Sequence, residues 1–408
     1  MTPLVRVVVV TRDGGALLER CLERLAEVDW PRERLEVVLV DNASTDGSVA
    51  RAVAAHPDTR VIRSPRNVGY AAGNNLALAE LGDVDFVALL NNDAFVEPGW
   101  LQPLVDALEA DRELGAATSK VLFAPSYLEV ELEGPLTLRG VRVDGEDRWG
   151  DTLFAEGWLD PDFDPEAGPP YRRSEKRAKL WVPETPTRRA ELLLDSWVEV
   201  ELGGEPFDVV NNVGTVLLPG GHAADRGFLQ RDEGQFEQPE EVFAWSGTSV
   251  LLRRAYLDEV GLFDPRLFAY YEDVDLSWRG RARGWRYLYV PGSVVRHAHA
   301  ATAVVGSELF DYHLERNRLL VYAKNAPPRY AFAALGESLR VTGLHVRRDV
   351  VRRLRARERP TTTFLRRRSR ALGGFVRGLP VTLRERRGLP AKVPAPELER
   401  WLANGKAR

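Results

Sequence analysis

The segment FVALLNNDAFVEPGW (residues 86–100) changes abruptly from apolar to polar, and this change constrains the fold of the chain. Its first five residues are apolar without alternation, which is typical of a strand that is buried on both faces. The triplet Asn91-Asn92-Asp93 follows at once. Two interpretations are open: these polar side chains cap the next helix, or they form a metal and phosphate site at the edge of a sheet.

Strands and helices alternate on both sides of this segment through the first 125 residues. Apolar runs predict strands at 5–11, 35–41, 60–63, 85–90 and 115–122, and apolar residues at helical spacing predict helices at 17–25, 44–56, 71–81 and 100–110. This alternation predicts an α/β fold with a doubly wound, mostly parallel sheet. Ligands of such sheets bind beyond the carboxyl ends of the strands.

The chain of 408 residues is too long for one simple domain. We expect residues 1–124 to form the first half of the α/β domain and residues 208–328 the second half. Between them, residues 125–207 combine turns rich in Pro, Gly and Asp with alternating stretches such as AELLLDSWVEVELGG, which predicts a small antiparallel β insertion. Residues 329–408 are predicted to be a basic helical extension.

The second half and the extension have their own periodic segments. They predict a strand followed by a helix within 243–264, a helix at 270–284, a strand at 285–290, and helices at 308–326 and 330–357.

Composition excludes several classes of protein. Cys21 is the only cysteine, so neither an internal disulfide nor a cysteine-rich metal site is possible. We expect no signal peptide, because the first residues lack a basic segment followed by an apolar core and a cleavage site. No apolar run approaches the ~20 residues that span a bilayer. A cytoplasmic protein is the expectation.

The charge is divided unevenly along the chain. The net charge is −4, yet residues 337–387 hold 16 Arg and 4 Asp or Glu, a net of +12. Such a segment indicates an anionic partner. Basic segments gain about 1 kcal/mol per arginine near anionic lipid, and Leu339, Leu344 and Leu354 are among the apolar residues that would face the interface. The alternative is a solvated basic helix. Nucleic acid is disfavoured because no aromatic stacking pattern accompanies the charge.

Four polar clusters follow the predicted strands of the first half. They are Thr11-Arg12-Asp13, Asp41-Asn42-Ala43-Ser44, the segment from Asn67 to Asn75, and Asn91-Asn92-Asp93. Each cluster alone could cap a helix or, at Gly69 and Gly73, permit close packing. Four clusters that converge on one edge of a sheet favour a binding site.

These segments resemble the successive motifs of the inverting family-2 glycosyltransferases with the GT-A fold. The motifs are VVVVTRD, VLVDNASTDGS, SPRNVGYAAGNN and LLNNDAFVEPGW. AWSGTSVLLRRAYLDEVGLFDPRLFAYYEDVDLSWR, VVRHAHA and HLERNRLLVYAKN resemble the acceptor half of the same family. The branch that is most similar comprises the rhamnosyl- and galactofuranosyltransferases of bacterial surface glycans. The resemblance covers about residues 4–124 and 208–326, and implies a nucleotide-diphosphate sugar as donor and a hydroxyl of a glycan or lipid-linked acceptor.

The resemblance implies a divalent cation, Mg²⁺ or Mn²⁺, that offsets charge on the leaving diphosphate. The family's Asp-x-Asp motif is Asn91-Asn92-Asp93 here, so only Asp93 retains a carboxylate and is the expected metal ligand, with Asn92 in support. His297 is placed by resemblance as a second group for metal or diphosphate, with His299 as the alternative. The implied nucleotide-binding residues are Thr11, Asp41, Asn67, Gly69, Asn74 and Asn92, and uridine or thymidine diphosphate is the expected nucleotide.

An inverting transfer needs a base that takes the proton of the acceptor hydroxyl. The segment YYEDVDLSWR supplies three carboxylates. Asp275 lies four residues before Arg279 on a predicted helix, which indicates an ion pair. Glu272 and Asp273 match the family's Glu-Asp motif, so the resemblance implies Asp273 as base and Glu272 as its substitute.

Trp245, Ser246 and Gly247 resemble the segment that closes over the donor sugar and the acceptor. Trp245 either stacks on a sugar ring or fills the core. Arg316 and Asn317 either contact anionic acceptor groups or tie the last helix to the sheet.

Three other functions are possible for a chain with this pattern. A dinucleotide-dependent oxidoreductase requires a G-x-G-x-x-G turn, and TRDGGALL stands there instead. A sugar nucleotidyltransferase requires a Gly-rich, basic loop after the first strand, which has only Arg12. The remaining rival is a catalytically degenerate scaffold or binding protein, which the replacement of a carboxylate by Asn91 favours and the intact Glu272-Asp273 pair opposes. A lipid-linked acceptor would place the enzyme at the inner face of the plasma membrane.

Overall fold

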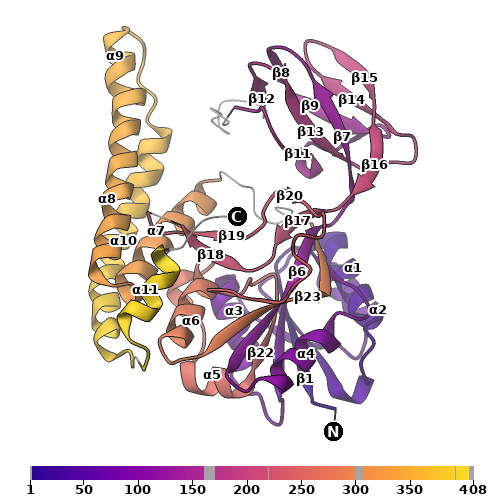
Figure 1. Ribbon diagram of the computed structural model, residues 1–408, viewed down its shortest axis with the longest axis vertical. Coiled ribbons are helices and arrows are strands. Elements are labelled where there is room, and N and C mark those ends of the chain that lie inside the picture. Colours follow the sequence, from indigo (N-terminus) through magenta and orange to yellow (C-terminus); the bar gives the residue numbers. More distant parts are fainter. Residues whose placement is uncertain (1, 160–170, 219, 299–306, 391, 404–408) are drawn as a thin grey trace.

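The computed structural model describes residues 2–159, 171–218, 220–298, 307–390 and 392–403 (Figure 1). Its largest sheet contains the predicted strands of the first half. They are β1 (Val5–Thr11), β2 (Leu35–Asp41), β3 (Arg60–Arg63), β4 (Phe86–Asn91), β5 (Ala94–Val96) and β6 (Leu114–Phe123). The second half adds β17 (Val209–Asn212), β20 (Gln230–Arg231), β21 (Glu240–Glu241), β22 (Ser249–Arg253) and β23 (Arg286–His297).

Apart from the two-residue β20, six strands of this sheet run in one direction. β3, β2, β1 and β4 are parallel neighbours. β22 is antiparallel to both β4 and β6, so β6 has the direction of β4, and β23 is parallel to β6. The carboxyl ends of these six strands therefore lie at the same edge. The mixed, mostly parallel α/β sheet that the sequence predicts is confirmed.

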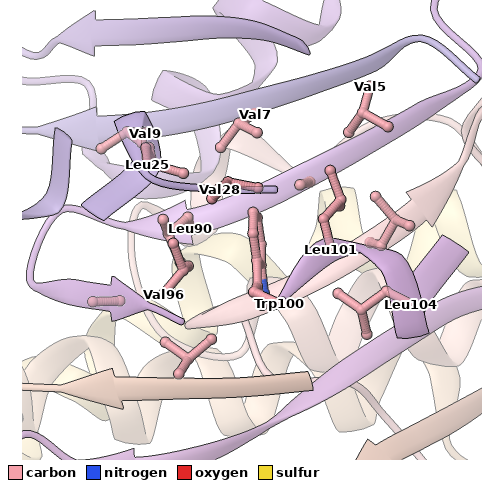
Figure 2. Close-up of a cluster of buried hydrophobic side chains, with 14 of the residues drawn as sticks. Val5, Val7, Val9, Leu25, Val28, Leu90, Val96, Trp100, Leu101 and Leu104 are labelled. Atoms are coloured by element: carbon pink, nitrogen blue, oxygen red, sulfur yellow. The ribbon is translucent and has the colours of Figure 1, made fainter. Parts of the chain in front are cut away.

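The sheet is buried on both faces, which explains its unbroken apolar runs. On one face Val5, Val7 and Val9 of β1 pack with Trp100, Leu101 and Leu104 (Figure 2). Val8 and Val10 point to the other face and belong to a second cluster. Within the first cluster, Nε1 of Trp100 donates to Ser249 Oγ at 3.0 Å, so its polar atom is satisfied within the core.

Helices cover both faces of the sheet (Figure 1). They are α1 (Gly15–Ala26), α2 (Ser48–Ala55), α3 (Gly69–Leu78), α4 (Leu101–Ala110), α5 (Arg254–Val260) and α6 (Glu272–Arg281), with single turns η1 (Arg32–Arg34) and η3 (Pro265–Leu267). The expected start of α2 at residue 44 is wrong. Asp41 Oδ1 accepts the Ser44 amide and Asp13 Oδ1 accepts the Thr45 amide, so these residues form a turn, and α2 begins after Gly47.

Residues 127–207 contain antiparallel sheets of their own. One consists of β11 (Leu153–Phe154), β13 (Ala178–Pro183), β7 (Tyr127–Leu132) and β16 (Gly203–Phe207), and the other of β10 (Glu146–Asp147), β9 (Gly140–Val143), β14 (Arg189–Leu193) and β15 (Trp197–Glu201). β8 (Leu136–Leu138) pairs with β12 (Arg172–Ser174), and η2 (Trp149–Asp151) is a single turn. Leu128, Val141, Leu180 and Leu192 belong to the separate core of this insertion.

The remaining elements lie to the left of the main sheet in Figure 1. β18 (Thr215–Leu218) and β19 (His222–Asp225) form a hairpin, and α7 (Glu308–Asn325), α8 (Pro328–His345), α9 (Arg353–Arg355), α10 (Thr363–Gly388) and α11 (Ala395–Ala403) follow. The helix expected over 330–357 contains a π-helical segment, η4 (Val346–Arg352). Within the described part of the chain, the structure contains no helix with the length and apolarity needed to cross a membrane.

Candidate active site

A cavity of about 530 Å³ opens at the carboxyl ends of β1 and β4. Ten of the residues singled out by the sequence line it, and they come from both halves of the α/β domain: Thr11, Asn67, Gly69, Asn92, Asp93, Ser246, Gly247, Glu272, Asp273 and His297. The sheet brings them together because its parallel strands end at one edge.

Asp93 and His297 meet at the floor of this cavity. Oδ1 of Asp93 lies 3.1 Å from Nε2 of His297, and both side chains are buried. The contact is set by the sheet, since β23 pairs with β5 and places His297 opposite Ala94. Nδ1 of His297 lies 3.1 Å from Oδ1 of Asn211. When Nδ1 donates to that oxygen, the lone pair of Nε2 points toward Asp93.

The amide nitrogen of Asn92 binds another residue of the cavity wall. Its Nδ2 donates to Oγ1 of Thr11 at 2.9 Å, which links the ends of β4 and β1. A Cβ on Gly14 would lie 2.6 Å from that Thr11 oxygen, so only glycine leaves room for this pair at the start of α1. Thr11 and Asn92 therefore form a rigid part of the cavity wall.

The loop before α3 is held by Asn42, a member of the predicted polar cluster at the end of β2. Asn42 donates through Nδ2 to Oδ1 of Asn67 at 2.9 Å and accepts the amide of Val68 at 2.8 Å. Gly69 has φ +83°, and a Cβ there would lie 2.5 Å from both the ring and the carbonyl oxygen of Phe268. The loop can therefore approach the second half of the domain only because residue 69 is glycine.

Glu272 and Asp273 begin α6 at the cavity wall. Asp273 accepts the amide of Val274 through Oδ1 at 2.7 Å and that of Gly247 through Oδ2 at 3.3 Å. Oε2 of Glu272 is buried and has no hydrogen-bond partner among the described residues. Burial raises the pKa of Glu272 well above its usual range, with a further rise from the neighbouring Asp273 charge. Burial also raises the pKa of Asp273, to about 6.

The backbone that leads into these carboxylates is strained. Phe268, Tyr270 and Tyr271 have φ of +66°, +69° and +67°, a region that large side chains rarely adopt. The fully buried Asn317 of α7 stabilises this path: its Nδ2 donates to the carbonyls of Leu267, Ala269 and Tyr270 at 2.7–2.8 Å. Asn317 therefore ties α7 to the segment before α6, and not to the sheet as one of the two predicted roles had it.

Several cavity residues were missed. Asn211 and Asn212 end β17, and Asp225 ends β19. Asp225 lines the cavity, and desolvation by the surrounding protein raises the pKa of its carboxyl. The side-chain amide of Asn212 donates a hydrogen bond to this carboxyl and lowers the pKa in part. Asn211 and Asn212 follow two valines, as Asn91 and Asn92 follow an apolar run, so the same pattern could have revealed them.

Three predicted site residues do not line the cavity. Trp245 is fully buried and packs edge-on against Phe263, so its position is the core-filling alternative rather than the sugar-stacking one. The side chain of Asn74 is buried within α3, where Nδ2 donates to the Tyr70 carbonyl. Asp41 accepts the Ser44 amide outside the cavity wall.

Two further sequence predictions concern charged and metal-binding side chains. The ion pair predicted for Asp275 is confirmed: Asp275 is buried and lies 2.9 Å from Nε of Arg279 and 3.1 Å from Nζ of Lys324. His299, the alternative to His297, lies outside the described residues.

The fit of a divalent cation can be judged from the donor atoms. The described residues contain no group of three or more His, Cys, Asp or Glu side chains that could hold a metal ion. Asp93 and His297 nevertheless place a hard oxygen and an imidazole nitrogen 3.1 Å apart, and Asn211 orients the ring. Mg²⁺ and related ions often bind through one or two protein groups with substrate phosphates and water. The pair therefore fits a cation that is shared with a bound diphosphate.

Comparisons with known proteins agree with this arrangement. The sequence model "Glycosyl transferase family 2" matches residues 6–127, and "Glycosyltransferase like family 2" matches residues 224–318. The chain is 29% identical over 327 residues to N-acetylglucosaminyl-diphospho-decaprenol L-rhamnosyltransferase of Mycobacterium tuberculosis, an alignment that covers 77% of this chain and 82% of the relative.

A solved structure has the same fold. It is GalNAc-T7 with UDP, GalNAc and Mn²⁺, which superimposes with a TM-score of 0.51 at 15% identity over 81% of this chain. The chain spans about half of that protein, 49% of its length. The two family segments match the two halves that build the cavity. The protein therefore belongs to glycosyltransferase family 2, has the GT-A fold, and is similar to a bacterial L-rhamnosyltransferase.

Proposed function

We propose that the protein is an inverting, metal-dependent glycosyltransferase of cell-surface polysaccharide synthesis. It moves a sugar from a nucleotide-diphosphate donor to a hydroxyl of a glycan or lipid-linked acceptor. The observation that carries this proposal is the placement of two distinct sets of groups in one cavity: the Asp93–His297 pair and the Glu272–Asp273 pair.

Asp273 is the proposed base. Its raised pKa, about 6, leaves it mainly ionised at neutral pH yet basic enough to accept a proton. The carboxylate takes the proton of the acceptor hydroxyl while that oxygen forms a bond to the anomeric carbon. The bond from this carbon to the diphosphate breaks, and its electron pair leaves with the diphosphate. Attack from the face opposite the leaving group inverts the configuration.

Glu272 is proposed to bind rather than to deprotonate. Burial raises its pKa well above the usual range, which favours the protonated form. Its buried Oε2 has no partner among the described residues, and a sugar hydroxyl would satisfy it.

Asp93 and His297 are the residues proposed to hold Mg²⁺ or Mn²⁺. The ion would supply positive charge to the diphosphate as it leaves. Thr11, Asn67 and Gly69 are proposed to contact the nucleotide, with Asn42 positioning the loop from Asn67 to Gly69. Uridine and thymidine diphosphates are the candidate nucleotides.

The acceptor side of the cavity supports an acceptor that is partly apolar. Leu309, Phe310 and Leu314 of α7 line it together with Ser246 and Gly247. The mycobacterial relative is named for a lipid-linked acceptor, decaprenyl diphosphate N-acetylglucosamine. We therefore propose a lipid-linked acceptor here, and a location at the inner face of the plasma membrane. In this proposal residues 1–124 bind the donor and residues 208–328 bind the acceptor.

The test is calorimetric titration with UDP and with dTDP, each with and without Mn²⁺. Binding of one nucleotide that requires the metal and is lost in Asp93→Ala would support the donor site. Absence of binding by both nucleotides in all conditions would favour the alternative, a catalytically degenerate scaffold, for which the loss of a carboxylate at Asn91 is the supporting observation.

A further inference from the structure

The helical hairpin of residues 328–388 has an exposed cationic side. Arg366, Arg377 and Arg384 of α10 are exposed, and their spacings of eleven and seven residues place them on one face of the helix. None of the three forms an ion pair with a residue that the structure describes. Figure 1 shows α8 and α10 along one side of the molecule, with α7 between them and the main sheet. The buried residues of α10, among them Ala371 and Phe375, lie on a different side of the helix from these arginines.

The same hairpin exposes apolar side chains. Of fifteen large hydrophobic residues that are exposed in the described chain, eight lie in this hairpin: Phe332, Leu339, Leu344, Val351, Leu354, Val376, Val381 and Leu383. Phe332 is 73% exposed and Val376 is 62% exposed. Phe332 and Leu339 are seven residues apart, as are Val376 and Leu383, so each pair shares one face of its helix.

These exposed apolar residues are separate from the residues through which the two helices pack on the rest of the protein. The opposite faces of the two helices are the buried ones, with Ala334 and Ser338 on α8 and Ala371 and Phe375 on α10. The outward faces thus combine exposed Phe, Leu and Val with unpaired arginines. This combination is typical of helices that lie in the interface of a membrane.

Helix α10 is linked to the rim of the cavity. Leu309 and Leu314 of α7 line the cavity and are 61% and 36% exposed. Glu308, the residue before Leu309, forms an ion pair with Arg370 of α10. The arginine-bearing helix is therefore joined to α7 at the point where the apolar rim of the cavity begins.

We propose that the outward face of the 328–388 hairpin docks on a bilayer surface that contains anionic lipid. Its arginines bind lipid phosphates, and Phe332, Leu339, Val376 and Leu383 enter the interface. Nucleic acid matches these residues less well, because stacking on bases needs aromatic side chains and Phe332 is the only exposed large aromatic residue of the described hairpin. The docking itself does not depend on the proposed function. Only its role in bringing a lipid-linked acceptor to Leu309 and Leu314 rests on that function.

The test is sedimentation of the full-length protein with vesicles of phosphatidylcholine alone or with 30% phosphatidylglycerol. We expect binding only to the anionic vesicles, and weaker binding at high salt. About 1 kcal/mol per arginine corresponds to about fivefold in affinity. The triple variant Arg366→Gln, Arg377→Gln, Arg384→Gln should therefore bind roughly a hundredfold more weakly. The double variant Phe332→Ser, Val376→Ser should lose the part of the binding that persists at high salt.

A matched control changes the same number of charges elsewhere. Arg112, Arg139 and Arg189 are exposed residues outside the hairpin, and their replacement by Gln should leave vesicle binding within about twofold. Equal weakening in both triple variants would overturn the proposal, as would failure of the wild type to bind anionic vesicles. Two other results would also overturn it: binding of a single-stranded oligonucleotide through these arginines without vesicle binding, and a dimer that buries Phe332.

Nucleotide binding separates this proposal from the proposed function. Titration with UDP and dTDP in the presence of Mn²⁺ should give the same affinity in the wild type and in the α10 triple variant. A wild-type protein that binds anionic vesicles but neither nucleotide would contradict the proposed transferase and support the docking surface. A wild-type protein that binds nucleotide but no anionic vesicles would contradict the docking surface and support the proposed transferase.

Discussion

Oδ1 of Asp93 lies 3.1 Å from Nε2 of His297, although 204 positions separate the two residues in the chain. The contact joins the first half of the α/β domain to the second at the floor of the cavity. No carboxylate directly precedes Asp93 in the chain, because Asn91 and Asn92 occupy those positions. The Asp93–His297 pair is thus the part of the site where loss of one group should have the clearest effect on metal-dependent binding.

Asp93→Ala should remove the dependence of nucleotide binding on Mn²⁺. Titration with the nucleotide that the wild type binds should show at least a tenfold loss of affinity with Mn²⁺ and little change without it. His297→Ala should have the same effect, and Asn211→Ala a smaller one, because Asn211 only orients the imidazole. Unchanged metal dependence in Asp93→Ala would exclude this pair as the cation site.

Asp273→Asn should lower the rate of transfer roughly 10²–10⁴-fold while donor binding remains within about threefold of the wild type. The amide preserves the size of the side chain but cannot accept the acceptor proton, and loss of a general base typically costs 10²–10⁴ in rate. Turnover with donor and acceptor, and titration with the nucleotide, give the two measurements. Glu272→Gln is the matched control and should retain more activity, since Glu272 is assigned to binding. Turnover of Asp273→Asn near the wild-type rate would remove Asp273 as base.

Activity should rise with pH through about 6. The pKa of Asp273 is raised to about 6 by burial, so the base is protonated below this pH and ionised above it. The acidic limb of the kcat/KM profile of the wild type should lie near this value. It should be missing from the residual activity of Asp273→Asn, and an identical limb in that variant would assign the titration to another group.

The same pKa predicts a pH-dependent effect on stability. A carboxyl whose pKa is raised on folding contributes stability below its unfolded pKa of about 3.8, and this contribution is lost as the pH rises through about 6. Asp273→Asn should therefore stabilise the protein above pH 6, by on the order of 1 kcal/mol, and have little effect near pH 4. Thermal unfolding of both proteins at pH 5 and pH 8 measures the difference. A variant that is less stable at pH 8 would contradict the buried charge.

Asn317→Ala should lower kcat more than it changes KM. The side chain donates to three carbonyls of the strained segment before Glu272, and each bond contributes about 1 kcal/mol. We expect a loss of about 2–4 kcal/mol in the free energy of unfolding. Leu180→Ala, in the separate core of the insertion, is the control because it destabilises to a similar degree. If the two variants lose kcat equally, Asn317 is structural only.

Gly69→Ala should disrupt nucleotide binding, whereas Gly82→Ala should not. Both glycines have positive φ, +83° and +53°, so both substitutions introduce backbone strain. Only at Gly69 would the new Cβ meet backbone, 2.5 Å from the Phe268 carbonyl, while nothing lies within 4 Å at Gly82. Nucleotide affinity and thermal unfolding of the two variants separate steric displacement of the loop from strain. Equal effects of the two substitutions would contradict the role of the close approach.

The sequence alone determined the elements of the sheet and the polar residues at their ends. Val5–Thr11 and Phe86–Asn91 are strands with both faces buried, and an unbroken run of apolar residues predicts such a strand from the sequence. The order of motifs also identified the family, and ten of the predicted site residues line one cavity.

Only the tertiary structure decided which polar residues face that cavity. Trp245 adjoins Ser246 and Gly247 in sequence, but it packs in the core beside Phe263. These residues lie between β21 and β22, where no regular periodicity assigns side chains to a face. Asn211 reaches the cavity from β17, which pairs with the distant strand β6, and Asp225 reaches it from β19 of the β18–β19 hairpin. A raised pKa at Asp273 likewise depends on burial by both halves of the domain. Local periodicity carries information on strand and helix, whereas burial and charge proximity depend on contacts between distant segments, which one sequence does not record.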